Sequence, residues 1–153
     1  MIHRRFAEAE VEYPKVVELN PAAPWAHAGS GLCYLLEGRF EEAVKEARQD
    51  SAVWAQLLVQ SLARFGQKQM PESNVALSTQ IRDFADVSAY QIAEVYAYRG
   101  DPGNTFNWLE RAYRQRDGGL TSIRVDPLFA PVNSDPRWGA FMKKLGLDGA
   151  LPQ

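Results

Sequence analysis

The chain has 153 residues, of which 46% are hydrophobic and 24% are charged, as in typical soluble globular proteins. A chain of this length can form one domain with a real hydrophobic core. Its net charge of −2 gives no electrostatic reason to expect a nucleic acid or an anionic membrane as a partner. The lone cysteine, Cys33, excludes an internal disulfide and is typical of a buried residue in a reducing compartment, so we expect a cytoplasmic protein.

The N-terminal part of the chain is not expected to contain a targeting signal or a membrane span. Residues 1–15, MIHRRFAEAEVEYPK, are charged throughout and lack the apolar region of a signal peptide. The longest stretch without Asp, Glu, Lys or Arg is residues 19–36. This stretch contains Pro21, Pro24 and several small or polar residues, which exclude a membrane-spanning helix.

Apolar residues recur at helical spacing along most of the chain, so the sequence predicts an all-α protein. Strand signals are weak because no Asn-Gly or Asp-Gly turn separates alternating apolar runs. Asp126 and Asp135 each precede a proline, and this combination favours the start of a helix. The expected helices, in chain order, are residues 2–19, 22–37, 40–50, 52–65, 71–84, 86–99, 102–116, 127–132 and 135–145.

Three glycines are expected to end helices and reverse the chain. Gly38, Gly66 and Gly100 each follow an apolar periodic segment. Glycine adopts the left-handed conformation that closes a helix C-terminus without the steric cost that other residues carry. A further Asp-Gly-Gly sequence at residues 117–119 is expected to interrupt the helical pattern.

One five-residue segment of the sequence recurs with a single change. RFAEA at residues 5–9 returns as RFEEA at residues 39–43, which is 34 residues later. A degenerate copy of the segment before this phrase, LLVQSLARFG, lies at residues 57–66. Self-similarity at this period predicts a repeated unit of two helices. The residues that match at identical internal spacing are Gly31, Tyr34 and Gly38 in one copy and Ala93, Tyr96 and Gly100 in another.

Together these residues resemble the tetratricopeptide repeat, a helix–turn–helix unit of 34 residues. The resemblance covers about residues 6–117 and implies a right-handed α-α superhelix, a solenoid closed by a C-terminal capping helix segment. Such units stack because a single helix pair cannot bury its apolar face alone. The final part of the chain is also similar to the C-terminal repeat region of bacterial signalling and regulatory proteins. The resemblance divides the chain into a half repeat at 2–21, repeats at about 22–50, 52–84 and 86–117, and a cap at 126–146. These form one domain over 1–147, followed by a frayed tail at 148–153.

Two departures from the repeat pattern concern the N-terminal end. The first copy contains only the second helix of a pair, so its apolar face is expected to be open. Pro14 lies inside that helix, where it removes a hydrogen bond and predicts a kink.

Candidate catalytic and metal-binding residues are sparse. His3 and His27 have no second ligand at a suitable spacing, and the Gly-Ser-Gly sequence at 29–31 lacks the rest of a phosphate loop. Glu41 and Glu42 open a predicted helix, where acidic side chains favour the helix dipole. We therefore expect no enzyme activity, no metal site and no cofactor.

The repeat resemblance implies a binding groove instead. In the family, the first helix of each pair lines a concave face, and aromatic and Arg anchors are typical of peptide grooves. An alternative for the apolar members is packing on a neighbouring helix. The charged clamp by which well-known family members grip a C-terminal carboxylate has no counterpart here. The candidate partner-binding residues are Trp25, Leu32, Leu36, Gln56, Gln60, Arg64, Tyr90, Glu94 and Tyr98.

The sequence thus predicts a protein–protein interaction module, a scaffold or sensor that binds a peptide or helix in this groove. One alternative is a structural domain that forms a homodimer through the open N-terminal helix. Another is a regulatory fragment of a larger signalling protein. Neither a nucleic acid nor a membrane is an expected partner.

Overall fold

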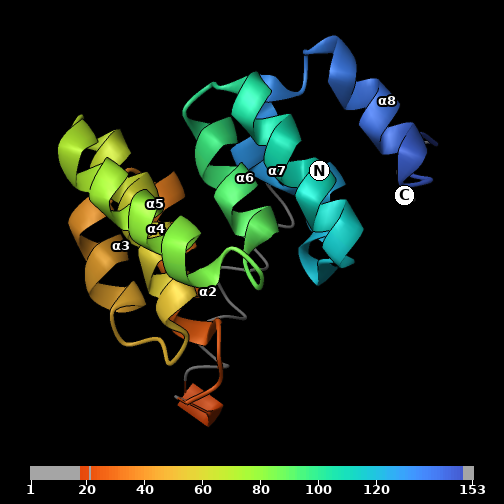
Figure 1. Ribbon diagram of the computed structural model, residues 1–153. Coiled ribbons are helices and arrows are strands. Elements are labelled where there is room, and N and C mark those ends of the chain that lie inside the picture. Colours follow the sequence, from red (N-terminus) through yellow and green to blue (C-terminus); the bar gives the residue numbers. More distant parts are fainter. Residues whose placement is uncertain (1–17, 21, 150–153) are drawn as a thin grey trace. The chain divides into compact units, whose positions relative to one another are not determined.

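The computed structural model describes residues 18–20 and 22–149, and every regular element in this part of the chain is a helix (Figure 1). The predicted all-α class is confirmed, and the predicted helices agree with the observed ones to within four residues at each end. The predicted N-terminal helix and half repeat lie mainly outside the described residues. The elements are α2 (Ala26–Leu36), α3 (Phe40–Ala47), α4 (Val53–Gly66), α5 (Met70–Phe84), α6 (Ala89–Tyr98), α7 (Pro102–Gln115), the 3-10 helices η1 (Gly118–Val125) and η2 (Pro127–Val132), and α8 (Pro136–Lys144).

The contacts divide the chain into two compact units, with the boundary between Ser88 and Ala89. The first unit contains α2 to α5, and the second contains α6, α7, η1, η2 and α8. The single domain over residues 1–147 stays a prediction from the sequence.

In the first unit, α2 packs against α3 and α4, and α4 packs against α3 and α5. The closest approach is at Gly31 of α2. A Cβ atom there would lie 2.9 Å from the carbonyl oxygen of Ala43 and 3.3 Å from Cγ1 of Val59. Glycine is therefore required at this crossing, because any side chain would push α3 away.

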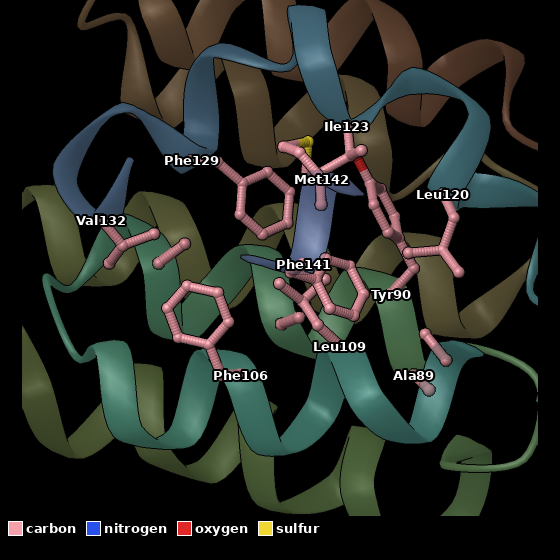
Figure 2. Packing of buried hydrophobic residues seen from close by; sticks show 13 residues of the cluster. Ala89, Tyr90, Phe106, Leu109, Leu120, Ile123, Phe129, Val132, Phe141 and Met142 are labelled. Atoms are coloured by element: carbon pink, nitrogen blue, oxygen red, sulfur yellow. The ribbon is translucent and has the colours of Figure 1, made fainter. Parts of the chain in front are cut away.

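In the second unit, α6 packs against α7, η1 and η2. Aromatic pairs join these elements further. The ring centroids of Phe106 in α7 and Phe141 in α8 lie 6.5 Å apart, and those of Tyr90 in α6 and Phe129 in η2 lie 5.4 Å apart. Figure 2 shows the labelled side chains converging on one core. The helix η1 was not predicted. It begins where the Asp117 side chain accepts a hydrogen bond from the Gly119 amide at 2.9 Å.

Glycines with positive φ end three helices. They are Gly38 after α2 (φ 79°), Gly100 after α6 (φ 71°) and Gly146 after α8 (φ 72°). After α2, the amide of Arg39 donates to the carbonyl of Tyr34 at 2.9 Å, and equivalent bonds follow α6 and α8. This closure satisfies carbonyl groups that would otherwise lack a partner at the helix end. Two of the three predicted left-handed glycines are confirmed.

Gly66 is the last residue of α4, so the helix ends where predicted, but the left-handed conformation predicted for Gly66 is wrong. Lys68 (φ 61°) takes that conformation instead. The amide of Gln69 then donates to the carbonyl of Arg64 at 2.8 Å, which is the same closure as after α2. Gly66 serves packing, because a Cβ atom there would lie 2.4 Å from the Phe40 ring.

This two-residue difference corrects the register of the repeat. The equivalent helix ends are Gly38, Lys68 and Gly100, so the spacings are 68 − 38 = 30 and 100 − 68 = 32 residues. In the same register, small buried residues occur 12 positions apart in all three helix pairs. These residues are Gly31 and Ala43, Ser61 and Ser73, and Ala93 and Thr105.

Candidate functional site

The nine predicted groove residues are divided between the two units. Six belong to the first unit and three to the second, so each set is placed within its own unit. The first set is Trp25, Leu32, Leu36, Gln56, Gln60 and Arg64, and the second set is Tyr90, Glu94 and Tyr98.

Three members of the first set form a stripe along α2. Trp25 precedes the helix, and Leu32 and Leu36 follow at intervals of seven and four residues, which places them on one helix face. Trp25 and Leu32 are half-buried, and Leu36 is 36% exposed. The adjacent face, with Ala28 and Leu35, is buried in the core. We call Trp25, Leu32 and Leu36 the α2 stripe.

The other three members form a second stripe along α4, at intervals of four residues. Gln56, Gln60 and Arg64 are all half-buried, and we call them the α4 stripe. The Gln56 side-chain amide donates to the carbonyl of Asp50 at 2.6 Å, and Arg64 donates to Oε1 of Glu41 at 2.8 Å. The two stripes lie on helices that contact each other. The α2 stripe is apolar, and the α4 stripe is polar.

Two tryptophans lie at the N-terminal ends of these helices. The rings of Trp25 and Trp54 stack, with centroids 5.6 Å apart and an interplanar angle of 21°. Both side chains are half-buried. Trp25 has a left-handed backbone, with φ at 76°, although it is not a glycine. Such a conformation costs about 1–3 kcal/mol and persists only where the surroundings enforce it.

Asp50 enforces the conformation of Trp25. One of its carboxylate oxygens, Oδ1, accepts hydrogen bonds from the amides of Trp25 at 3.1 Å and Ala52 at 2.9 Å. The other, Oδ2, accepts from the Ala28 amide at 2.9 Å. Asp50 is buried, so one carboxylate links the start of α2 to the entry into α4. A negative charge at a helix N-terminus is also favoured by the helix dipole.

Neither Trp54 nor Asp50 was predicted as a site residue. Helical spacing predicts only one face of α4, and Trp54 lies outside that face. Asp50 carried a detectable signal, because Asp before Ser51 and a helix is typical of a capping residue. Its bonds to α2 depend on the tertiary structure and have no local signature.

The second set lies largely in the interior of the second unit. Tyr90 is 3% exposed and Glu94 is 4% exposed, while Tyr98 is half-buried. The Tyr90 hydroxyl donates to Oδ2 of Asp126 at 2.7 Å. Burial, with Asp126 and Glu94 nearby, raises the pKa of Tyr90 above its usual range. Tyr90 and Glu94 therefore do not face a partner, because η1 and η2 cover this part of α6.

His27 does not gain metal-ligand partners in the described part of the chain. His27 is buried, and its Nδ1 lies 2.8 Å from Oε1 of Glu46. His3 lies outside the described residues. Within residues 18–20 and 22–149, no three His, Cys, Asp or Glu side chains are grouped so that they could hold a metal ion. Every helix in this range is too short or too polar to cross a lipid bilayer.

No family model, no curated protein and no solved structure matches the chain. The tetratricopeptide resemblance therefore stays a prediction from the sequence. So does the proposed dimer through the N-terminal helix, which falls mainly on residues outside the described range.

Proposed function

We propose that the chain is a tetratricopeptide-like protein–protein interaction module whose α2 and α4 stripes bind a peptide or a helix of a partner protein. The observation that supports this most strongly is the stacking of Trp25, a member of the α2 stripe, on Trp54. We further propose that the three helix pairs stack as a right-handed superhelix. The buried Cys33 supports a reducing, cytoplasmic setting.

Tryptophan is among the residues that contribute most to binding at protein interfaces. A stacked, half-buried pair of tryptophans offers a large, rigid contact area, and its side chains lose little conformational entropy when a partner binds. The left-handed backbone of Trp25 adds a second reason, since local strain is concentrated at functional positions. Asp50 holds that backbone in place before any partner arrives. Preorganisation of this kind increases affinity.

The two stripes also define the chemistry of the partner. Leu32 and Leu36 offer apolar contact along about one and a half turns of α2 beyond the tryptophan pair. Gln60 of the α4 stripe offers an amide that can both donate and accept hydrogen bonds. Arg64 is already bound to Glu41, so it contributes less attraction for an acidic side chain. The fitting partner is an amphipathic segment with apolar anchors and a polar edge.

Selection from a displayed library of random 15-residue peptides tests this proposal. The wild-type chain is the target, and the Trp54→Ala and Leu36→Ser variants are the comparison targets. The Tyr113→Ala variant is the matched control, because Tyr113 is a 40% exposed aromatic residue of the second unit. Circular dichroism checks that each variant is folded.

We expect enriched peptides with apolar residues at helical or alternating spacing. They should bind the wild type and the Tyr113→Ala variant but lose binding to Trp54→Ala and Leu36→Ser. If the selected peptides bind all four proteins equally, or if no peptide is enriched on the wild type, the proposal is overturned.

A further inference from the structure

The 3-10 helices η1 and η2 cover the face of α6 that carries Tyr90 and Glu94. Both helices contact α6. Each begins at an aspartate that also accepts a hydrogen bond from Tyr90 of α6. Asp117 precedes η1 and accepts the Tyr90 amide at 3.1 Å, and Asp126 precedes η2 and accepts the Tyr90 hydroxyl at 2.7 Å. Two carboxylates therefore fasten this segment, residues 117–132, to α6.

Both carboxyl oxygens of Asp126 accept hydrogen bonds. Oδ1 accepts from the Leu128 amide at 2.9 Å, and Oδ2 accepts from the Tyr90 hydroxyl. Glu94 is also hydrogen-bonded to Asp126. Two carboxyl groups share a hydrogen bond only if one of them carries a proton. Since Asp126 is the acceptor, the proton belongs to Glu94.

Glu94 is held in a setting that does not suit a negative charge. Its side chain is almost fully buried, and its Oε2 atom has no hydrogen-bond partner in the described part of the chain. The groups that face it are Tyr90 on its own helix, Asp126 before η2 and Asp117 before η1. From α7, the core receives Phe106, Leu109 and Ala112, none of which can titrate or carry a positive charge.

We propose that residues 117–132 form a pH-sensitive strap, which stays closed on α6 while Glu94 is protonated and opens when Glu94 ionises. Ionisation would place a third negative charge beside Asp126 and Asp117 in the interior. It would also remove the donor from the Glu94–Asp126 hydrogen bond. Both changes weaken the contacts that begin η1 and η2.

The direction of the pH dependence follows from the two states of Glu94. In the closed state, burial first, and then Asp126 and Asp117, raise its pKa well above the ordinary value. In the open state the side chain meets water, so its pKa returns towards about 4.3. Between these two values the closed state binds the proton and the open state does not. Each unit of rising pH therefore favours opening by about tenfold.

Hydrogen exchange of the full chain, followed by mass spectrometry and corrected for the intrinsic pH dependence of exchange, tests the strap. Protection of the amides in residues 117–132 is measured from pH 5 to pH 8. In the wild type we expect it to fall, by up to about tenfold per pH unit, while protection in the centre of α7 stays unchanged. Glu94→Gln keeps a donor for Asp126 but cannot ionise, so its protection should not change with pH.

Glu110→Gln is the matched control, because Glu110 is a part-exposed glutamate of the same unit that pairs with Lys144. It should behave as the wild type does. If Glu94→Gln does not fold, Asp126→Asn replaces it. With one charge fewer beside Glu94, the total pH-dependent loss of protection should be smaller. A flat profile in the wild type, or wild-type behaviour in the Glu94→Gln or Asp126→Asn variant, would overturn the proposal.

Discussion

Two glycines in helices of this protein have opposite surroundings. At Gly31 of α2, an added Cβ atom would meet the backbone carbonyl of Ala43 at 2.9 Å. That oxygen can move only if α3 moves with it. At Gly139 of α8, nothing lies within 4 Å of an added Cβ atom. The first glycine is required by packing, whereas the second only lowers the helical propensity of its segment.

The two glycine-to-alanine substitutions should therefore change stability in opposite directions. Gly31→Ala should lower the free energy of unfolding by about 1–3 kcal/mol, because overpacking displaces a neighbouring helix. Gly139→Ala should raise it by about 0.5–1 kcal/mol, because alanine restricts the unfolded chain and favours the helix. Urea denaturation measures both values. A Gly31→Ala variant as stable as the wild type would contradict the close crossing of α2 and α3.

Asp50 is the second residue whose loss should be costly. Asp50→Ala leaves the amides of Trp25, Ala28 and Ala52 without their acceptor, so we expect a loss of about 2–3 kcal/mol. Asp83→Ala is the control in the same unit, since Asp83 is exposed and pairs with its neighbour Arg82. That change should stay within about 0.5 kcal/mol of the wild type. Equal effects of the two substitutions in thermal unfolding would refute the linking role of Asp50.

At the scale of the elements, the helix ends show how the three helix pairs are related. Lys68 occupies the left-handed position that Gly38 and Gly100 occupy in the other two pairs. A residue with a Cβ atom pays a steric cost in this conformation that glycine avoids. The end of α4 therefore has the same hydrogen-bonded closure as the ends of α2 and α6, but with lysine in place of glycine at the left-handed position.

The reciprocal exchanges follow from this comparison. Lys68→Gly should raise the free energy of unfolding by about 0.5–1 kcal/mol, while Gly38→Lys should lower it by about 1 kcal/mol. Nothing lies within 4 Å of a Cβ atom added at position 38. The loss of stability in Gly38→Lys therefore comes from the left-handed backbone and not from a steric clash. Chemical denaturation of the two variants and the wild type measures these changes in the free energy of unfolding. A destabilising Lys68→Gly change would show that the register deduced for the middle pair is incorrect.

Local chemistry explains which elements could be predicted from the sequence. The starts of η2 and α8 were predicted correctly, because Asp126 and Asp135 accept hydrogen bonds from amides only two residues ahead. The role of Gly66 was not predictable, since it depends on the Phe40 ring of another helix. The same holds for Tyr90, whose burial depends on η1 and η2. Contacts between distant parts of the chain leave no signature in a local pattern.

At the scale of the whole molecule, the two units carry different functional features. The first unit presents the α2 and α4 stripes beside the stacked tryptophans, and the second contains the buried cluster of Glu94 and its neighbours. Helical spacing groups the six candidates of the first unit into two sets of three along α2 and α4. It could not separate an exposed face of α6 from one covered by residues 117–132, because both have the same period.

The central claim is that the α2 and α4 stripes bind an amphipathic segment. Calorimetric titration of one selected peptide into the wild type, Leu36→Ser and Tyr113→Ala tests this claim most directly. We predict at least a tenfold higher Kd for Leu36→Ser, which corresponds to about 1.4 kcal/mol, and an unchanged Kd for Tyr113→Ala. The same Kd for Leu36→Ser and the wild type would contradict the claim.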